Sequence, residues 1–206
     1  MSARQKDVVL VLEDIHDPHN SAAILRTADA FGIQTVHYIF NTVEPYDPSR
    51  IGKASSSSAN KWLTFRIYSK RNFQFSIFNF QTNSNNKTNP TPASRLASPN
   101  RGGEPSESEG EEGLDNPTIS CLEGLKKEGY KIVGTALNET ATDLYKFKWP
   151  EKVALLVGNE HAGLSETALK MCDSLIYIPM RGFVQSLNVS VATALCIGEL
   201  TRSRNK

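Results

Sequence analysis

Short apolar runs rich in β-branched residues alternate with segments of helical periodicity along most of the chain. The runs are VVLVLEDI (8–15), TVHYIF (35–40), KWLTFRIYS (61–69), YKIVGTAL (130–137), VALLVGNE (153–160) and SLIYIPM (174–180). Helical patterns begin at Asn20 and Ser186 and also cover residues 119–129 and 165–172. Strands that are apolar on both faces belong in a mostly parallel sheet with helices on each side. The alternation therefore predicts an α/β fold of this kind.

A polar stretch at about residues 79–118 interrupts this alternation. It is rich in Asn, Ser, Pro, Thr, Gly and Glu, and after Phe80 it holds only two leucines as large aliphatic side chains. Such a composition buries too little apolar surface to offset the entropy of ordering, and the cost of closing a loop grows slowly with its length. We therefore expect a single domain, residues 1–206, with a disordered insertion at 79–118. The aromatic segment FQFSIFNF (73–80) is either an extra edge strand or an apolar tail.

Composition excludes several classes of protein. The chain has 206 residues, of which 39% are apolar and 22% charged, as expected for one globular domain. No apolar run approaches the roughly 20 residues that span a bilayer, and the N-terminus lacks a signal peptide, so we expect a soluble protein of the cytoplasm. The three cysteines are far apart and the four histidines are scattered, so no metal site or disulfide framework is indicated. The sequence also lacks the glycine-rich nucleotide-binding motifs and any convincing Ser/His/Asp spacing.

The charge is unevenly distributed, although the formal net charge is only +1. No acidic residue lies between Asp47 and Glu104, whereas lysines and arginines recur there, and an acidic segment follows at 104–115. A basic surface suits a polyanion such as RNA, because bound Lys and Arg release counterions from phosphates. The alternative is a solvated basic loop. The candidate RNA-binding residues are Arg50, Lys53, Lys61 and Arg66.

The segment NSAAILRTADAFG (20–32) has the pattern of an amphipathic helix that Asn20 could cap. Arg26 would then lie in the second turn, near the end of the helix that already carries positive partial charge. Two interpretations are open: an ion pair with Asp29, or a positive charge placed at a helix N-terminus to bind an anion.

The segment LLVGNEHAGLS (155–165) leads an apolar strand into Gly158, Asn159 and Glu160. Gly158 would let a ligand approach the backbone, and Glu160 would place a carboxylate at the carboxyl end of the strand, where ligand sites of open α/β sheets lie. A plain strand-to-helix turn, with Ser165 capping the next helix, is the alternative.

The segment IPMRGFVQSLNVSVATAL (178–195) places Ser186 and Asn188 at the start of an otherwise apolar helix. Helix capping accounts for one of these two polar residues but not for both. The apolar pattern between them indicates a helix that is buried on most sides.

Together these three segments resemble the three motifs of the SpoU/TrmH family, in the SPOUT superfamily of RNA 2′-O-ribose methyltransferases. The matching motifs are Asn-x₅-Arg at Asn20 and Arg26, Gly-Asn-Glu at 158–160, and Ser-Leu-Asn-Val-Ser at 186–190. KASSSSANKWL (53–63) is similar to a Ser-rich loop of the family. The resemblance covers about residues 7–69 and 118–203.

The resemblance implies an α/β fold with a deep C-terminal trefoil knot, and a homodimer whose active site is completed across the interface. It also implies S-adenosylmethionine as methyl donor. By position, the cofactor-binding residues would be Thr135, Ala136, Leu137, Gly158, Asn159, Ile178, Met180 and Leu187.

The catalytic residues implied in the same way are Arg26, Asn20, Glu160, Ser186 and Asn188. Arg26 would be either the general base or a charged group that stabilises the forming alkoxide; a guanidinium is not normally deprotonated in proteins, which favours the second role. The expected substrate is a guanosine of the tRNA D-loop. Another tRNA position, rRNA, or a catalytically silent RNA-binding module on the same fold are the alternatives.

Overall fold

The computed structural model describes residues 4–51, 62–70, 72–79 and 116–204. Its strands are β1 (Val8–Glu13), β2 (Thr35–Phe40), β3 (Thr64–Ser69), β4 (Asn72–Asn79), β5 (Lys131–Thr135), β6 (Thr142–Asp143), β7 (Val153–Val157) and β8 (Ser174–Tyr177). Its helices are α1 (Pro18–Ala30), α2 (Pro117–Lys127), α3 (Glu166–Met171) and α4 (Val189–Arg204), with a 3₁₀ turn at Pro48–Arg50. The predicted α/β alternation is confirmed.

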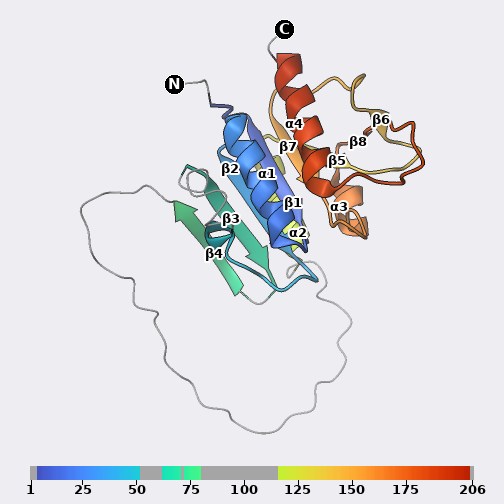
Figure 1. Ribbon diagram of the computed structural model, residues 1–206. Helices are drawn as coiled ribbons and strands as arrows, with labels where there is room; N and C mark the ends of the chain where they lie inside the picture. Colours follow the sequence, from blue (N-terminus) through green and yellow to red (C-terminus); the bar gives the residue numbers. More distant parts are fainter. Residues whose placement is uncertain (1–3, 52–61, 71, 80–115, 205–206) are drawn as a thin grey trace, which may run out of the picture.

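All eight strands form one sheet in the order β4-β3-β2-β1-β7-β5-β8-β6 (Figure 1). Neighbouring strands are parallel except β3 and β4, which are antiparallel. The aromatic segment before the polar stretch is thus an edge strand, one of the two expectations for it. The two-residue strand β6 was not predicted, because it is too short to show an apolar pattern.

Helices cover both faces of the sheet, as the apolar runs predict. Along β1, Val8, Leu10 and Leu12 pack in a core with residues of α1 and α4, whereas Val9 and Val11 pack in a second core with residues of α2 and α3. Residues alternate in this way because successive side chains of a strand point to opposite faces. Buried on both sides, the central strands have no face on which a polar residue is tolerated without a partner.

Strands made late in the chain lie between strands made earlier. β7 lies between β1 and β5, and β8 lies between β5 and β6. The connections therefore cross over the sheet rather than adding strands at its edge. This interleaving places the carboxyl ends of β5, β7 and β8 next to one another, and the candidate site lies there.

Two helix starts differ from the expectation. Asn20 does not cap α1: Asp17 does, accepting a hydrogen bond from the backbone N–H of His19 at 2.8 Å, with Pro18 at the first helical position. α4 begins at Val189 rather than at Ser186. Ser165 caps α3 as expected, accepting from the N–H of Ala168.

The expected disordered insertion at 79–118 lies outside the described residues except at its ends. Asn79 closes β4, and Asn116 caps α2 by accepting hydrogen bonds from the N–H groups of Thr118 and Ile119. Most of the Ser-rich segment 53–63 also lies outside the described residues.

Candidate active site

A cavity of about 510 Å³ opens at the carboxyl ends of β5, β7 and β8. This is the edge of an open α/β sheet where ligand sites are usually built, and the volume suits a small organic ligand. All the residues expected to bind the methyl donor line the cavity: Thr135, Ala136, Leu137, Gly158, Asn159, Ile178, Met180 and Leu187. Glu160 and Ser186, two of the expected catalytic residues, line it as well.

One wall of the cavity is a tight loop that follows β7. The backbones of Asn159 and Gly163 exchange hydrogen bonds of 2.9 and 3.0 Å, and Gly163 has a φ of 72°, which favours glycine. Gly158 has no room for a Cβ atom, because that atom would meet the backbone of Gly163 and Leu164. The close approach that Gly158 permits is therefore made by its own chain, and not by a ligand as the sequence suggested.

The Asn159 side chain ties this loop to the end of β1. Its amide nitrogen donates to the carbonyl of Asp14 at 2.7 Å, and its oxygen accepts from the N–H groups of His161 and Ala162. Asn159 therefore fixes the conformation of the loop and lines the cavity as well.

Glu160 joins the same loop to the β1–α1 connection. Its carboxylate accepts hydrogen bonds from the backbone N–H groups of His16, at 3.0 Å, and Asp17, at 3.3 Å, and from the side-chain amide of Asn20 at 2.9 Å. Partial burial raises the pKa of the Glu160 carboxyl, but these hydrogen bonds outweigh that effect, so its pKa is below the ordinary value. Glu160 is thus held as a carboxylate.

Asn20 connects Glu160 to the start of α4. While its amide nitrogen donates to Glu160, its oxygen accepts from the side chain of Asn188 at 3.0 Å. The oxygen of Asn188 in turn accepts from the N–H of Ser190 at 2.9 Å, which caps α4. The three sequence motifs are thereby joined by one chain of hydrogen bonds, Glu160–Asn20–Asn188, beside the cavity.

Arg26 lies away from these hydrogen-bonded residues, and it does not lie at the positive end of its helix as the sequence suggested. Because α1 begins at Pro18, Arg26 is past the middle of the helix, about 9 Å along the axis from Asn20. It is exposed and is not among the described residues that line the cavity. A cation in this half of a helix has the sign that the helix dipole favours.

The expected RNA-binding residues are dispersed. Arg50 is exposed and pairs with Asp47 at 3.0 Å, and Arg66 on β3 pairs with Glu128 at 3.0 Å. Lys53 and Lys61 lie outside the described residues. The side chain of Arg66 is 32% exposed and that of Arg50 is 79% exposed, so Arg66 is the weaker candidate for a phosphate contact.

Two buried acids that the sequence did not single out support the site. Glu13, 1% exposed, accepts hydrogen bonds from the hydroxyl of Thr118 and from both the N–H and the hydroxyl of Ser165, joining β1 to α2 and α3. Asp14 has a φ of 52° and accepts from the N–H groups of Asn41 and Thr42. In the sequence they look like the polar end of a strand, and only their position directly after an apolar run hints at a role.

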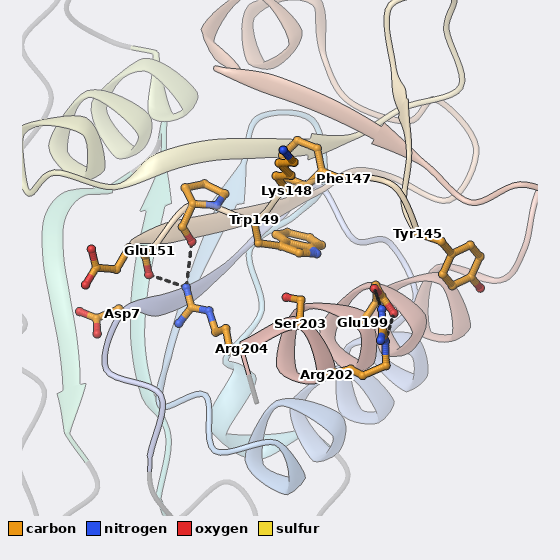
Figure 2. A pocket seen from close by; sticks show the side chains of 11 residues that line it. Asp7, Tyr145, Phe147, Lys148, Trp149, Glu151, Glu199, Arg202, Ser203 and Arg204 are labelled. Atoms are coloured by element: carbon orange, nitrogen blue, oxygen red, sulfur yellow. Dashed lines mark hydrogen bonds and ion pairs between the residues drawn. The ribbon is translucent and has the colours of Figure 1, made fainter. Parts of the chain in front are cut away.

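A second cavity, of about 500 Å³, lies at the opposite end of the strands, near the amino ends of β1 and β7, between the segment 145–151 and the end of α4 (Figure 2). Its aromatic lining comes from Tyr145, Phe147 and Trp149. Its arginines are engaged: Arg202 pairs with Glu199, and Arg204 donates to the carbonyls of Pro150 and Glu151. None of the three motifs contributes to its described lining, so we assign the candidate active site to the first cavity.

Other kinds of site find no support in the part of the chain that the structure describes. Those residues include no group of three or more His, Cys, Asp or Glu side chains that could hold a metal ion. Among the same residues, no helix has both the length and the apolar character needed to cross a membrane.

Comparisons with known proteins agree with the motifs. The model of the SpoU rRNA Methylase family matches residues 7–88 and 116–198. A tRNA (guanosine(18)-2′-O)-methyltransferase of Thermus thermophilus is 31% identical over 203 residues, which are 98% of this chain and 78% of the relative.

Solved structures give the same result. The TrmH/SpoU tRNA modifying enzyme of A. aeolicus superposes with a TM-score of 0.68 at 26% identity, covering 98% of this chain and 77% of that one. An AdoMet-bound rRNA methyltransferase of Sinorhizobium meliloti has a TM-score of 0.65 at 20% identity, covering 98% of this chain and 58% of that one, and shares the fold.

Proposed function

The chain belongs to the SpoU rRNA Methylase family, and from this membership we propose that it methylates a ribose 2′-hydroxyl of a guanosine in the tRNA D-loop. It is an RNA 2′-O-methyltransferase by family. The observation that carries the proposal is the joining of Glu160, Asn20 and Asn188 beside one cavity, since three distant segments of sequence converge there. The tRNA preference rests on the relatives that act on guanosine 18 of tRNA.

The first cavity fits S-adenosylmethionine as the methyl donor. Its lining combines apolar side chains, among them Leu137, Ile178 and Met180, with the backbone of Gly158 and the ends of three strands. Such a site offers backbone hydrogen bonds to an adenosine and an apolar surface to its ring. When bound there, S-adenosylmethionine supplies an electrophilic methyl group on a positively charged sulfur.

The residues around the cavity position the ribose. Glu160, Asn20 and Asn188 hold each other, which fixes the start of α1 against the start of α4. Ser186, exposed and in the cavity lining, presents a hydroxyl to the substrate. Because methyl transfer is an in-line displacement, holding the 2′-oxygen on the axis of the breaking bond is the main task of the protein.

Arg26 acts as a positive charge toward the RNA. A guanidinium keeps its proton in proteins, so its contribution is to stabilise the negative charge that develops on the 2′-oxygen and to bind phosphate. Arg26 is not among the described residues that line the cavity of its own protomer. We therefore assign Arg26 to the cavity of the partner protomer in a homodimer.

An exposed apolar surface on α1 and α4 supports the homodimer. Val191 and Leu195, one turn apart on α4, are 48% and 38% exposed, and Phe31, directly after α1, is 38% exposed; α1 and α4 pack against each other. Exposed apolar side chains one turn apart on a helix favour association with a second copy. The trefoil knot is likewise a proposal, supported by the interleaved positions of β7 and β8 in the sheet.

The decisive experiment incubates the purified protein with labelled S-adenosylmethionine and separate tRNA and rRNA pools, then maps the methylated position. We expect label at a D-loop guanosine of tRNA and its loss with Arg26→Ala. Label confined to rRNA or to another tRNA position would redirect the proposal. No label in any RNA would favour the alternative of a catalytically silent RNA-binding module. We also propose that the protein acts in the cytoplasm, because tRNA is the expected substrate. Cell fractionation would test this location.

Mixing two variants of reduced activity tests the shared site. If Arg26 serves the partner, dimers of Arg26→Ala with Glu160→Gln hold one intact site each, and random exchange restores about a quarter of the sites. If Arg26 serves its own protomer, the activity of the mixture stays at the average of the two variants.

A further inference from the structure

The backbone of Asp14, directly after β1, has a left-handed conformation. Its φ is 52°, and among the described residues it is the only one other than glycine with a positive φ. This conformation brings the Cβ atom of an L-residue close to the following carbonyl, although aspartate and asparagine tolerate it better than most because their side chains hydrogen-bond locally. It persists where the surrounding structure holds it in place, and such residues cluster at functional sites. Contacts of the carboxylate and of the carbonyl account for it here.

The carboxylate of Asp14 is held by the turn that follows β2. Its Oδ1 atom accepts hydrogen bonds from the backbone N–H groups of Asn41, Thr42 and Val43 at 2.8, 3.1 and 3.3 Å, and Oδ2 accepts from the hydroxyl of Thr42 at 3.0 Å. Successive N–H groups in a turn form a concave anion site, and hydrogen bonds to a carboxylate are stronger than those between neutral groups. Asp14 is only 7% exposed. Its side chain is therefore fixed, and its backbone with it.

The carbonyl of Asp14 faces the loop after β7. In a regular strand the N–H and the C=O of one residue point toward the same neighbouring strand. The N–H of Asp14 donates to the carbonyl of Ile39 on β2 at 2.8 Å, whereas its own carbonyl accepts from the side chain of Asn159 at 2.7 Å. β2 and β7 lie on opposite sides of β1. The turn of the backbone at Asp14 therefore joins the end of β1 to the loop after β7.

Asn159 passes this contact on to the tip of the loop. Its side-chain oxygen accepts from the N–H groups of His161 and Ala162 at 2.8 and 3.1 Å, and its backbone carbonyl accepts from the N–H of Gly163 at 3.0 Å. These four residues line the first cavity. Because the nitrogen and oxygen of an amide are rigidly joined, the bond to Asp14 also sets the direction of the oxygen that holds the tip.

We infer that Asp14 is a positioning residue for the loop 158–163, and through that loop for the methyl donor. The inference rests on the proposed function, which places S-adenosylmethionine in the first cavity. The turn at 41–43 holds the carboxylate, the carboxylate holds the backbone at positive φ, and the carbonyl holds Asn159. Asp14 is not among the described residues that line the cavity, so it acts through Asn159 and not on the methyl donor directly.

The first test measures hydrogen exchange of the amides of residues 161–163 by NMR, without ligand. In Asp14→Ala the contacts of the carboxylate are lost and the left-handed backbone is strained, so we expect exchange at least about tenfold faster, the size of one lost hydrogen bond. Asp14→Asn keeps a side chain that suits this conformation and an oxygen that accepts from the turn, so the rates should stay within about threefold.

A matched control removes a comparable carboxylate at the other end of the sheet. Asp173 accepts a hydrogen bond from the backbone N–H of Ile132 at 2.8 Å, at the amino end of β5 and opposite the cavity. Asp173→Ala should leave exchange at 161–163 unchanged once global stability, from urea unfolding, is taken into account. In Asp14→Ala the amides of β7 should change only by the loss of global stability, which identifies the faster exchange at 161–163 as a local effect.

The second test asks whether Asp14 acts through Asn159. The affinity for S-adenosylmethionine, measured by calorimetry, should weaken at least about tenfold in Asp14→Ala and less than about threefold in Asp14→Asn. When Asn159→Ala is already present, adding Asp14→Ala should change the affinity less than about twofold, because residues that act through one contact are not additive. A merely structural role of Asp14 would weaken the affinity by the same factor in both backgrounds.

The outcomes separate this inference from the proposed function. Unchanged exchange at 161–163 in Asp14→Ala, or equal factors in the two backgrounds, overturns the role of Asp14. An unmodified protein that does not bind S-adenosylmethionine overturns both. An unmodified protein that binds S-adenosylmethionine but methylates no RNA contradicts the proposed function alone, and exchange and affinity then still decide the role of Asp14.

Discussion

Glu160 accepts a hydrogen bond from the side-chain amide of Asn20 at 2.9 Å, although 140 positions separate the two residues in the chain. The contact joins the loop after β7 to the first turn of α1. Asn20 passes the connection on to Asn188 at the start of α4. Three loops that could move independently are thereby held as one unit at the mouth of the cavity.

Replacement of this carboxylate is expected to loosen that unit. Glu160→Gln puts an amide N–H₂ group where one oxygen accepts backbone N–H groups, so at least one donor faces another donor. Hydrogen bonds to charged groups contribute about 1.5–3 kcal/mol, which corresponds to a loss of about 10- to 150-fold in kcat/KM. Steady-state methylation of tRNA measures this loss of kcat/KM, with Glu123→Gln on the exposed side of α2 as control. Equal activity of Glu160→Gln and wild type would contradict the role of this contact.

A methyl group at residue 158 is expected to disturb the cavity. In Gly158→Ala the new Cβ meets the backbone of Gly163 and Leu164, which cannot rotate away as a flexible side chain could. The loop has to shift, so we expect at least about a tenfold weaker affinity for S-adenosylmethionine, or 1.4 kcal/mol, measured by calorimetry. Gly182→Ala is the matched control, since its Cβ meets no atom within 4 Å. An unchanged affinity in Gly158→Ala would show that the loop tolerates the shift.

Acid is expected to destabilise the fold through His37. Burial first, and the charge of Arg66 second, lower the pKa of this histidine from 6.5 to about 3. Between those values the unfolded chain binds a proton that the folded protein does not, so stability is full above pH 6.5 and falls as the pH drops toward 3. The slope contributed by one proton is up to about 1.4 kcal/mol per pH unit.

The variant His37→Phe removes this titration while keeping an aromatic ring beside Tyr68, with which His37 stacks at 5.9 Å. Urea unfolding between pH 4 and 7 should therefore show a shallower loss of stability in the variant. Parallel curves for both proteins would mean that other groups account for the acid sensitivity.

A charge on the exposed side of α4 is expected to break the proposed dimer. Leu195→Glu places a carboxylate one turn from the exposed Val191 on α4, and burying an unpaired charge in an interface there costs several kcal/mol. Light scattering should report a monomer, and methylation should fall with it if Arg26 acts across the interface. Lys127→Glu, exposed on α2 at the other face of the sheet, should leave the mass unchanged. A dimeric Leu195→Glu would place the interface elsewhere.

Most of the strands and the lining of the first cavity could be predicted from the sequence, for different reasons. Runs such as residues 153–157 are apolar at every position, a pattern that only a strand covered on both faces explains. The cavity residues were expected only through the family motifs. Apolar patterning does not specify which strand lies beside which, and the order β1-β7-β5 could not have been read from it.

The errors at the start of α1 have a local cause. The pair Asp17-Pro18 is a strong signal for a helix start, since aspartate caps well and proline suits the first helical position. Asn20 satisfies the same capping preference, and its true partners, Glu160 and Asn188, are distant in sequence. The cap lies at Asp17, three residues before Asn20, so the sequence placed Arg26 nearly one turn too close to the positive end of the helix dipole. Glu13 was missed because its donors come from two helices far along the chain.

The position of β7 between β1 and β5 has a consequence for synthesis on the ribosome. Residues 153–157 emerge after both neighbours, so the middle of the sheet stays open until roughly the last quarter of the chain is made. Until then the inner edges of β1 and β5 carry unpaired backbone groups on apolar strands, which are templates for aggregation. A nascent chain of this protein therefore needs either rapid completion or a chaperone more than a protein whose strands are added from the centre outward.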